Sequence, residues 1–272
     1  MMVPYLTSIM PIERQFSTGD MPVLVSCSDM NTYICKYARL RGKAFRLGTE
    51  LTGGLFSLLW GINSPNCALV NIKPEHWDIK YSGYRSSAPA VGYYFLKDVI
   101  DVNSSSFMTI NRSKTTLYQL LQIALFDFWV ANEDRTYNNP NMLYCISEGK
   151  LVSIDYGGIL NTSSYDYEMS QLTSTDTILY ADIFKYLSSG YERQTICDLR
   201  DNAIVNGREA IKSCHKNLPV LLNNIPPEWE LDNKFIYDKL MQLFDSKWID
   251  GCIDNFIAVS YTHLTLPTTP YV

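Results

Sequence analysis

The feature that most constrains the fold of this chain is an apolar helical pattern that runs directly into a polar loop. Apolar side chains recur at helical spacing at Leu117, Leu120, Leu121, Ala124, Leu125 and Phe128, which predicts an amphipathic helix. The loop, residues 132–141, reads Asn-Glu-Asp-Arg-Thr-Tyr-Asn-Asn-Pro-Asn. Two short apolar runs follow at 142–145 and 151–154, and Asp155 comes directly after the second run. The sequence therefore predicts a helix, a loop, a hairpin and a single acid in that order.

The first third of the chain is predicted to be rich in β-structure. Residues 23–27 and 32–37 are short runs of β-favouring side chains with a hairpin turn between them. Residues 49–60 carry leucines at helical spacing and are predicted to form a helix despite two glycines. Residues 67–72 and 92–99 are predicted to be further strands.

The rest of the chain is predicted to be mainly helical, with further helices at about 174–188, 192–217 and 232–257. A loop-like, serine-rich stretch predicts a boundary between two lobes near residues 98–112. The expected architecture is an α+β fold with two lobes. Residues 1–100 would form a β-rich first lobe with one helix, and residues 101–259 a helical second lobe that carries the polar loop.

The last residues, 260–272, differ from the rest of the chain. They are rich in Thr and Pro, show no core periodicity, and resemble the translation of sequencing-adapter DNA. We therefore expect this tail to be foreign to the protein and the natural C-terminus to be missing. The alternative is a genuine frayed tail.

Composition excludes several classes of protein. Hydrophobic residues at 46% and charged residues at 19% are typical of a folded, soluble protein. The net charge of −5 provides no general attraction for nucleic acid or an anionic membrane. The apolar helix around 117–130 contains Asp127 and is not predicted to span a membrane. We expect no direct nucleic-acid or membrane partner.

Two further patterns bear on location and surface. The seven cysteines are scattered without metal-ligand spacing, and the first residues do not show the basic, apolar and small-residue pattern expected of a signal peptide. Both observations favour reduced thiols in the cytoplasm. A basic cluster occurs at Lys36, Arg39, Arg41, Lys43 and Arg46. Such a run most often forms a solvated face.

Three side chains in the second half of the chain match the needs of phosphoryl transfer. Asp134 follows the apolar helix and can orient an attacking hydroxyl, while Asn139, five residues later, can bind a metal ion. Asp155 ends an apolar strand, where an acid is costly unless it is paired or bound to a cation, and it can chelate magnesium on nucleotide phosphates. The alternative is that these residues only cap helices and form turns.

Two groups in the first third fit the same chemistry. Lys36 ends a predicted strand and Glu50 follows fourteen residues later on the next helix. A Lys in this position can contact the α- and β-phosphates of a nucleotide while the Glu holds it. Gly19 lies in a turn before the first strand pair and could cover the phosphates with backbone N–H groups. Alone, a strand-ending Lys is usually a solvated side chain and Gly19 an ordinary turn residue.

With these residues assembled, the chain resembles the HipA-like serine/threonine kinases of bacteria, specifically their shorter single-chain branch. The resemblance spans about residues 17–250. It is carried by residues 19–25, 33–36, 125–135, 138–141, 154–158 and 225–229, together with Glu50.

The resemblance implies a two-lobed protein-kinase-like fold and an ATP- and magnesium-dependent kinase that acts on Ser or Thr of a protein. Asp134 would then be the catalytic base, Asn139 and Asp155 the magnesium ligands, and Lys36 and Glu50 the phosphate-binding pair. Adenine would lie near residues 94–99. Whether the chain binds a small partner protein, as in a toxin–antitoxin pair, stays open.

The chain departs from eukaryotic protein kinases. It lacks their His-Arg-Asp and Asp-Phe-Gly triplets and their loop with three glycines. Two other functions therefore stay open at the sequence level. One is a small-molecule kinase, and the other is a catalytically inactive nucleotide-binding module that acts as an interaction partner.

Overall fold

The fold is described from a computed structural model, which covers residues 2–38, 44–77, 88–103, 106–161, 168–173 and 175–265. Three members of the basic cluster, Arg39, Arg41 and Lys43, lie outside the described residues, as do residues 266–272 of the predicted tail. None of the helices in the described part of the chain combines the length and the apolar character needed to cross a membrane.

The N-terminal part is a mixed six-stranded sheet in the order β1-β5-β6-β4-β3-β2. Its strands are β1 (Tyr5–Thr7), β2 (Arg14–Gln15), β3 (Val23–Ser26), β4 (Thr32–Lys36), β5 (Cys67–Asn71) and β6 (Ala90–Tyr94). Only the pair β1–β5 is parallel. Helix α1 (Phe45–Leu59) packs on β5 and β6.

The two faces of this sheet explain where Lys36 points. Side chains alternate along a strand, so Tyr33 and Cys35 of β4 lie on the face that holds a small separate core. Lys36 lies on the opposite face, in register with Val91, which belongs to the larger core beneath α1. The ammonium group of Lys36, at the end of β4, therefore points toward α1.

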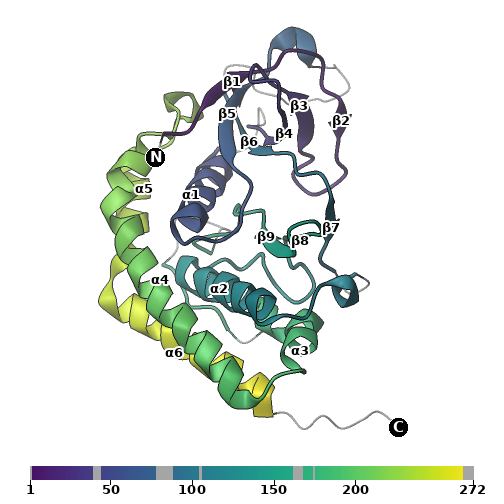
Figure 1. The fold of residues 1–272 in the computed structure, drawn as a ribbon. Coiled ribbons are helices and arrows are strands. Elements are labelled where there is room, and N and C mark those ends of the chain that lie inside the picture. The colour runs from purple at the N-terminus through teal and green to yellow at the C-terminus, as the bar shows by residue number, and fades with distance from the viewer. Residues whose placement is uncertain are drawn as a thin grey trace.

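The C-terminal part contains a three-stranded sheet and five helices within the described residues. The strands are β7 (Val99–Asp101), β8 (Met142–Cys145) and β9 (Lys150–Ser153), in that order. The helices are α2 (Lys114–Val130), α3 (Asp182–Ser188), α4 (Arg193–Leu222), α5 (Asn233–Met241) and α6 (Ser246–Thr265). Figure 1 shows α1 between the six-stranded sheet and α2, with α4 running along the side of both helices.

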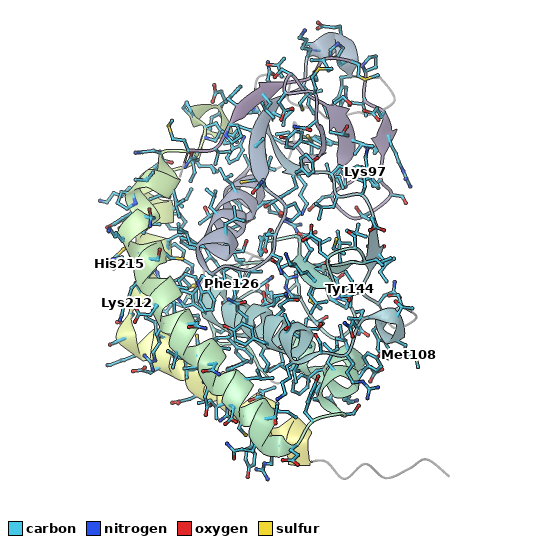
Figure 2. The ribbon with its side chains drawn as sticks, viewed as in Figure 1. Lys97, Met108, Phe126, Tyr144, Lys212 and His215 are labelled. Carbon is cyan, nitrogen blue, oxygen red and sulfur yellow. The ribbon has the colours of Figure 1, made fainter. Side chains whose placement is uncertain are left out.

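Helix α2 is the central element of this part. Ser113 caps it, accepting a hydrogen bond from the Thr116 N–H at 3.1 Å. Its side chains are buried from Ile123 to its end, and Phe126, labelled in Figure 2, contacts the ring of Tyr156. The helix ends at Ala131, whose left-handed backbone (φ 50°) turns the chain into the polar loop.

Several predicted elements have different bounds. The predicted strand 92–99 is divided, because β6 ends at Tyr94 and β7 joins the other sheet; Lys97, labelled in Figure 2, lies in the connection. The predicted helix 232–257 is interrupted at Asp245, whose carboxylate caps α6 by accepting from Lys247 N and Trp248 N. In place of the predicted helix at 174–188, residues Ile178–Tyr180 form a 3₁₀ turn and the short α3 follows at Asp182–Ser188.

The predicted tail, residues 260–272, overlaps with the end of helix α6. The helix continues to Thr265, and Ser260 is fully buried. Tyr261 lies against Arg193 of α4, with the guanidinium carbon 4.2 Å from the ring centroid. Residues 260–265 therefore belong to the helix, contrary to their exclusion from the fold, whereas the foreign origin of the tail stays a prediction.

Candidate active site

Lys36 and Glu50 meet between the sheet and α1. The Lys36 Nζ donates to Glu50 Oε2 at 2.8 Å, and Glu50 is 1% exposed. The other carboxylate oxygen, Glu50 Oε1, accepts a hydrogen bond from the backbone N–H of Tyr156 at 3.1 Å. Glu50 thus ties the end of β4 to the segment that follows β9.

Asp155 completes this cluster. Its Oδ1 lies 2.7 Å from the Lys36 Nζ, and its backbone is left-handed (φ 60°), a conformation that strains a non-glycine residue. Burial alone would lower the pKa of Lys36, but the carboxylates of Glu50 and Asp155 outweigh it and raise this pKa above its ordinary value. Burial opposes ionisation of Asp155 as well, yet the Lys36 charge lowers the pKa of Asp155. Both groups are therefore charged at neutral pH.

Asp134 and Asn139 meet in the polar loop. Asn139 Nδ2 donates to Asp134 Oδ1 at 3.1 Å and to the Asp134 backbone oxygen at 3.0 Å. Burial, followed by the negative charge of Asp155, raises the pKa of Asp134 against the opposing effect of Asn139. The charge of Asp155 therefore acts on Asp134, although within the described residues no direct contact joins the two carboxylates.

Gly158 makes this approach sterically feasible. A Cβ at residue 158 would lie 2.5 Å from the Asp134 Cβ and 2.8 Å from Asn132 Oδ1. Both distances are far below van der Waals contact. The segment after Asp155 can therefore lie against the loop only because residue 158 has no side chain.

We expect Gly158→Ala to displace the loop and to reduce stability by about 1–3 kcal/mol, the usual effect of overpacking. Urea unfolding measures the loss. The control is Gly19→Ala, where an added Cβ would meet no atom within 4 Å. Equal stability of the two variants would show that the segment and the loop are not in close contact.

A buried ion pair holds the loop in place. Arg135 is fully buried and its Nε lies 2.9 Å from Asp127 Oδ2 of α2. Asn132 Nδ2 donates to Asp127 Oδ1 at 2.9 Å, and Arg135 Nη1 donates to the backbone oxygens of Pro140 and Asn141. These bonds connect the helix to both ends of the loop that carries Asp134. Burial raises the pKa of Asp127 to about 6, against the opposing effects of Arg135 and Asn132.

Sequence reasoning missed this pair. Both residues lie in the stretch 125–135 that carries the family resemblance, but neither Asp127 nor Arg135 is assigned a role from the sequence. A signal was present, however, because a lone acid on an apolar helix must find a partner if the helix is buried. An Arg eight residues later was the obvious candidate.

Gly19 lies in an exposed turn, closed by a hydrogen bond from Met21 N to Thr18 O at 2.8 Å. The next residue, Asp20, reaches toward the site, with its carboxylate 3.9 Å from Lys36 Nζ and 3.6 Å from Arg46 Nη1. The turn therefore lies beside the Lys36 cluster. The adenine position near residues 94–99 stays a prediction.

The donor groups fit a hard divalent cation. Carboxylate and amide oxygens are the ligands that Mg²⁺ prefers, and the ionised Asp155 and the amide of Asn139 supply both kinds. The two bonds from Asn139 to Asp134 use only its amide nitrogen. In the described ranges no group of three or more His, Cys, Asp or Glu side chains is arranged to hold a metal. The proposed ligand pair, Asp155 and Asn139, contains a single carboxylate and is not a group of that kind.

Known structures share this arrangement of elements. A proinflammatory kinase of Helicobacter pylori, CtkA, aligns with a TM-score of 0.56 at 13% identity, over 95% of this chain and 99% of that one. The Golgi casein kinase with Mn/ADP bound aligns with a TM-score of 0.50 at 13% identity, over 94% and 75%. HipA of Shewanella oneidensis MR-1, in a complex with HipB and operator DNA, gives 0.41 at 12% identity, over 93% and 66%.

The first two likenesses define the class as a protein-kinase-like fold, and they confirm the predicted α+β architecture of a sheet-rich N-terminal part and a helical C-terminal part. The HipA-like kinase model matches residues 9–246. The chain therefore belongs to the HipA-like kinase family, as the sequence resemblance predicted, and its class of activity is that of a phosphotransferase. No match was found among curated proteins.

Proposed function

We propose that this chain is an ATP- and magnesium-dependent kinase that transfers the γ-phosphate to a Ser or Thr of a protein. The observation that carries the proposal is Lys36, held at 2.8 Å by Glu50 and at 2.7 Å by Asp155, in a site that also includes Asp134. This arrangement provides a cation for phosphates, an acid for a metal ion and an acid for the acceptor hydroxyl.

Each residue has one role in this proposal. Asp134 orients the acceptor hydroxyl and takes its proton as the oxygen attacks phosphorus. Asn139 and Asp155 hold Mg²⁺, which neutralises charge on the phosphates when it is bound. Lys36 contacts the α- and β-phosphates, and the backbone at Gly19 covers them. Glu50 keeps Lys36 extended across the site.

The metal role of Asp155 is tested by Asp155→Asn. We expect magnesium-dependent ATP turnover to fall by at least about a hundredfold, since the amide is a poorer ligand and no longer attracts Lys36. Turnover is measured against magnesium concentration. Asp250→Asn provides a matched control, because Asp250 is exposed and pairs only at the surface with Arg208. Similar turnover in wild type and Asp155→Asn would contradict the metal assignment.

The acceptor is tested with radiolabelled ATP and an extract that contains both proteins and metabolites. We expect the label on protein and, after acid hydrolysis, on phosphoserine or phosphothreonine. Label on a metabolite would instead support the small-molecule kinase. Nucleotide binding without any turnover would support the inactive binding module.

A further inference from the structure

Strand β9, which ends two residues before Asp155, lies at the edge of its three-stranded sheet. Val152 and Ile154 face the neighbouring strand, since Val152 pairs with Leu143 and the Ile154 N–H bonds to the residue before β8. The backbone groups of the alternate residues, 151 and 153, therefore point to the outer edge. Their side chains are fully buried, so these outer groups need partners within the protein.

All four of these outer backbone groups have a partner. The Leu151 N–H donates to Gln119 Oε1 of α2 at 3.0 Å, and the Leu151 carbonyl accepts from Asn63 Nδ2 at 3.1 Å. The Ser153 N–H donates to the backbone oxygen of Asn63 at 2.8 Å. The Ser153 carbonyl accepts from the Tyr156 hydroxyl at 3.3 Å. Asn63 therefore supplies two of the four partners and bonds to β9 much as a further strand would.

Asn63 reaches β9 because of the way α1 ends. Gly61 has a left-handed backbone (φ 70°), which glycine adopts without strain and which turns the chain out of the helix. The Ile62 N–H then bonds back to the Ser57 carbonyl at 3.0 Å, and the Ile62 side chain is buried. Asn63 follows directly. Its position is thus set by the end of the same helix that carries Glu50.

Asp155 lies between two anchors that both belong to α1 and its exit turn. On one side, the Asn63 carbonyl holds the Ser153 N–H, two residues before Asp155. On the other side, Glu50 Oε1 holds the Tyr156 N–H, one residue after it. The backbone of Asp155 itself is left-handed, a conformation that persists only when the surroundings hold it. Loss of an anchor would therefore let Asp155 leave its position.

We propose that Asn63 is a positioning residue for Asp155, because its side-chain amide holds β9, and through β9 the carboxylate of Asp155, in place. The proposal rests on the proposed function, which assigns Asp155 to the magnesium ion. Groups that hold a metal ligand from behind set the affinity of the site, and their loss typically costs about 10–100-fold in metal affinity. Asn63 acts through the strand and not on the nucleotide itself.

The test measures binding of adenylyl imidodiphosphate to the full chain by isothermal titration calorimetry, over a series of Mg²⁺ concentrations and in EDTA. We expect Asn63→Ala to raise the Mg²⁺ concentration that gives half of the gain in affinity by about tenfold, because the Leu151 carbonyl loses its donor. Binding in EDTA should change much less, since Lys36 keeps its bond to the buried Glu50. Asn63→Asp has the same size but cannot donate, and it should behave like Asn63→Ala.

Asn206→Ala is the matched control. It removes an amide bond of 2.7 Å to the Tyr118 hydroxyl, which joins α4 to α2 instead of the α1 turn to β9. It should leave the affinity unchanged both with Mg²⁺ and in EDTA. Thermal melting of each variant sets a temperature below every unfolding transition, and binding is measured there.

The outcomes separate the inference from the proposed function. If both Asn63 variants keep the Mg²⁺ dependence of wild type, or lose affinity equally with Mg²⁺ and in EDTA, Asn63 does not position Asp155 and the proposed function stands. If Asn63→Asp binds like wild type while Asn63→Ala does not, the amide donor is not what holds β9. If wild type gains no affinity from Mg²⁺, the metal role of Asp155 fails and the inference fails with it.

Discussion

Replacing Asp134 with Asn should reduce phosphate transfer by about 10²–10⁴-fold, the usual contribution of a positioned general base, while nucleotide binding persists. The amide keeps an oxygen for the bond from Asn139 but can no longer take a proton. Transfer is measured as the rate of label incorporation at saturating ATP. Glu133→Gln is the matched control, since Glu133 is the exposed acid next to it in the loop. Equal rates in wild type and Asp134→Asn would exclude Asp134 as the base.

The same residue should set the acidic limb of the pH–rate profile. Because burial and Asp155 raise the pKa of Asp134, the rate should decline, as pH falls, at a higher pH than for an ordinary carboxyl group. Folding disfavours the ionised form of a group whose pKa it raises. Asp134→Asn should therefore be at least as stable as wild type at neutral pH, so that loss of rate cannot be ascribed to unfolding.

Replacing Arg135 with Met should destabilise the protein by about 3–5 kcal/mol, because it leaves the carboxylate of Asp127 buried without its cation. The Asp127 side chain is fully buried, so water cannot replace the guanidinium. Urea unfolding measures the change. Arg208→Met breaks an exposed pair with Asp250 and should alter stability by only about 0–1 kcal/mol.

The double variant Asp127→Leu/Arg135→Met sharpens this test. Removing both charges avoids the unpaired carboxylate, so the double variant should be more stable than Arg135→Met alone. It should nonetheless lose transfer activity, because the loop that carries Asp134 has lost its bonds to α2. Equal stability of Arg135→Met and Arg208→Met would show that the buried pair does not hold the loop.

The elements with strong local signals were predictable from the sequence. The helix at 114–130, the loop and the hairpin are found close to their expected positions, because helical periodicity, turn residues and short apolar runs each specify a local structure. The same order of signals predicts a site made of Lys36, Glu50, Asp134, Asn139 and Asp155. The observed contacts join Lys36 with Glu50 and Asp155, and Asn139 with Asp134. Their catalytic roles stay predictions.

The elements that depend on distant partners were not predictable. Strands β1 and β2 have only three and two residues, too few to show an alternating pattern, and each exists because a neighbouring strand pairs with it. The break between α5 and α6 depends on a single capping acid, Asp245. Arg46 lies in the first turn of α1 because this helix begins at Phe45, before the predicted start at residue 49. The start was not predictable because helix ends are poorly specified without a capping side chain.

Helix α1 is fixed at its far end by Trp60. This ring stacks on Trp129 of α2, with centroids 5.4 Å apart, and lies against Gly207 of α4, where an added Cβ would come within 3.1 Å of it. Kinases are often switched off by swinging outward the helix that carries the Glu partner of the catalytic Lys. In this chain such a rotation would pull the Trp60 indole out of its stack with Trp129, so the stack holds α1, and with it Glu50, in its position beside α2.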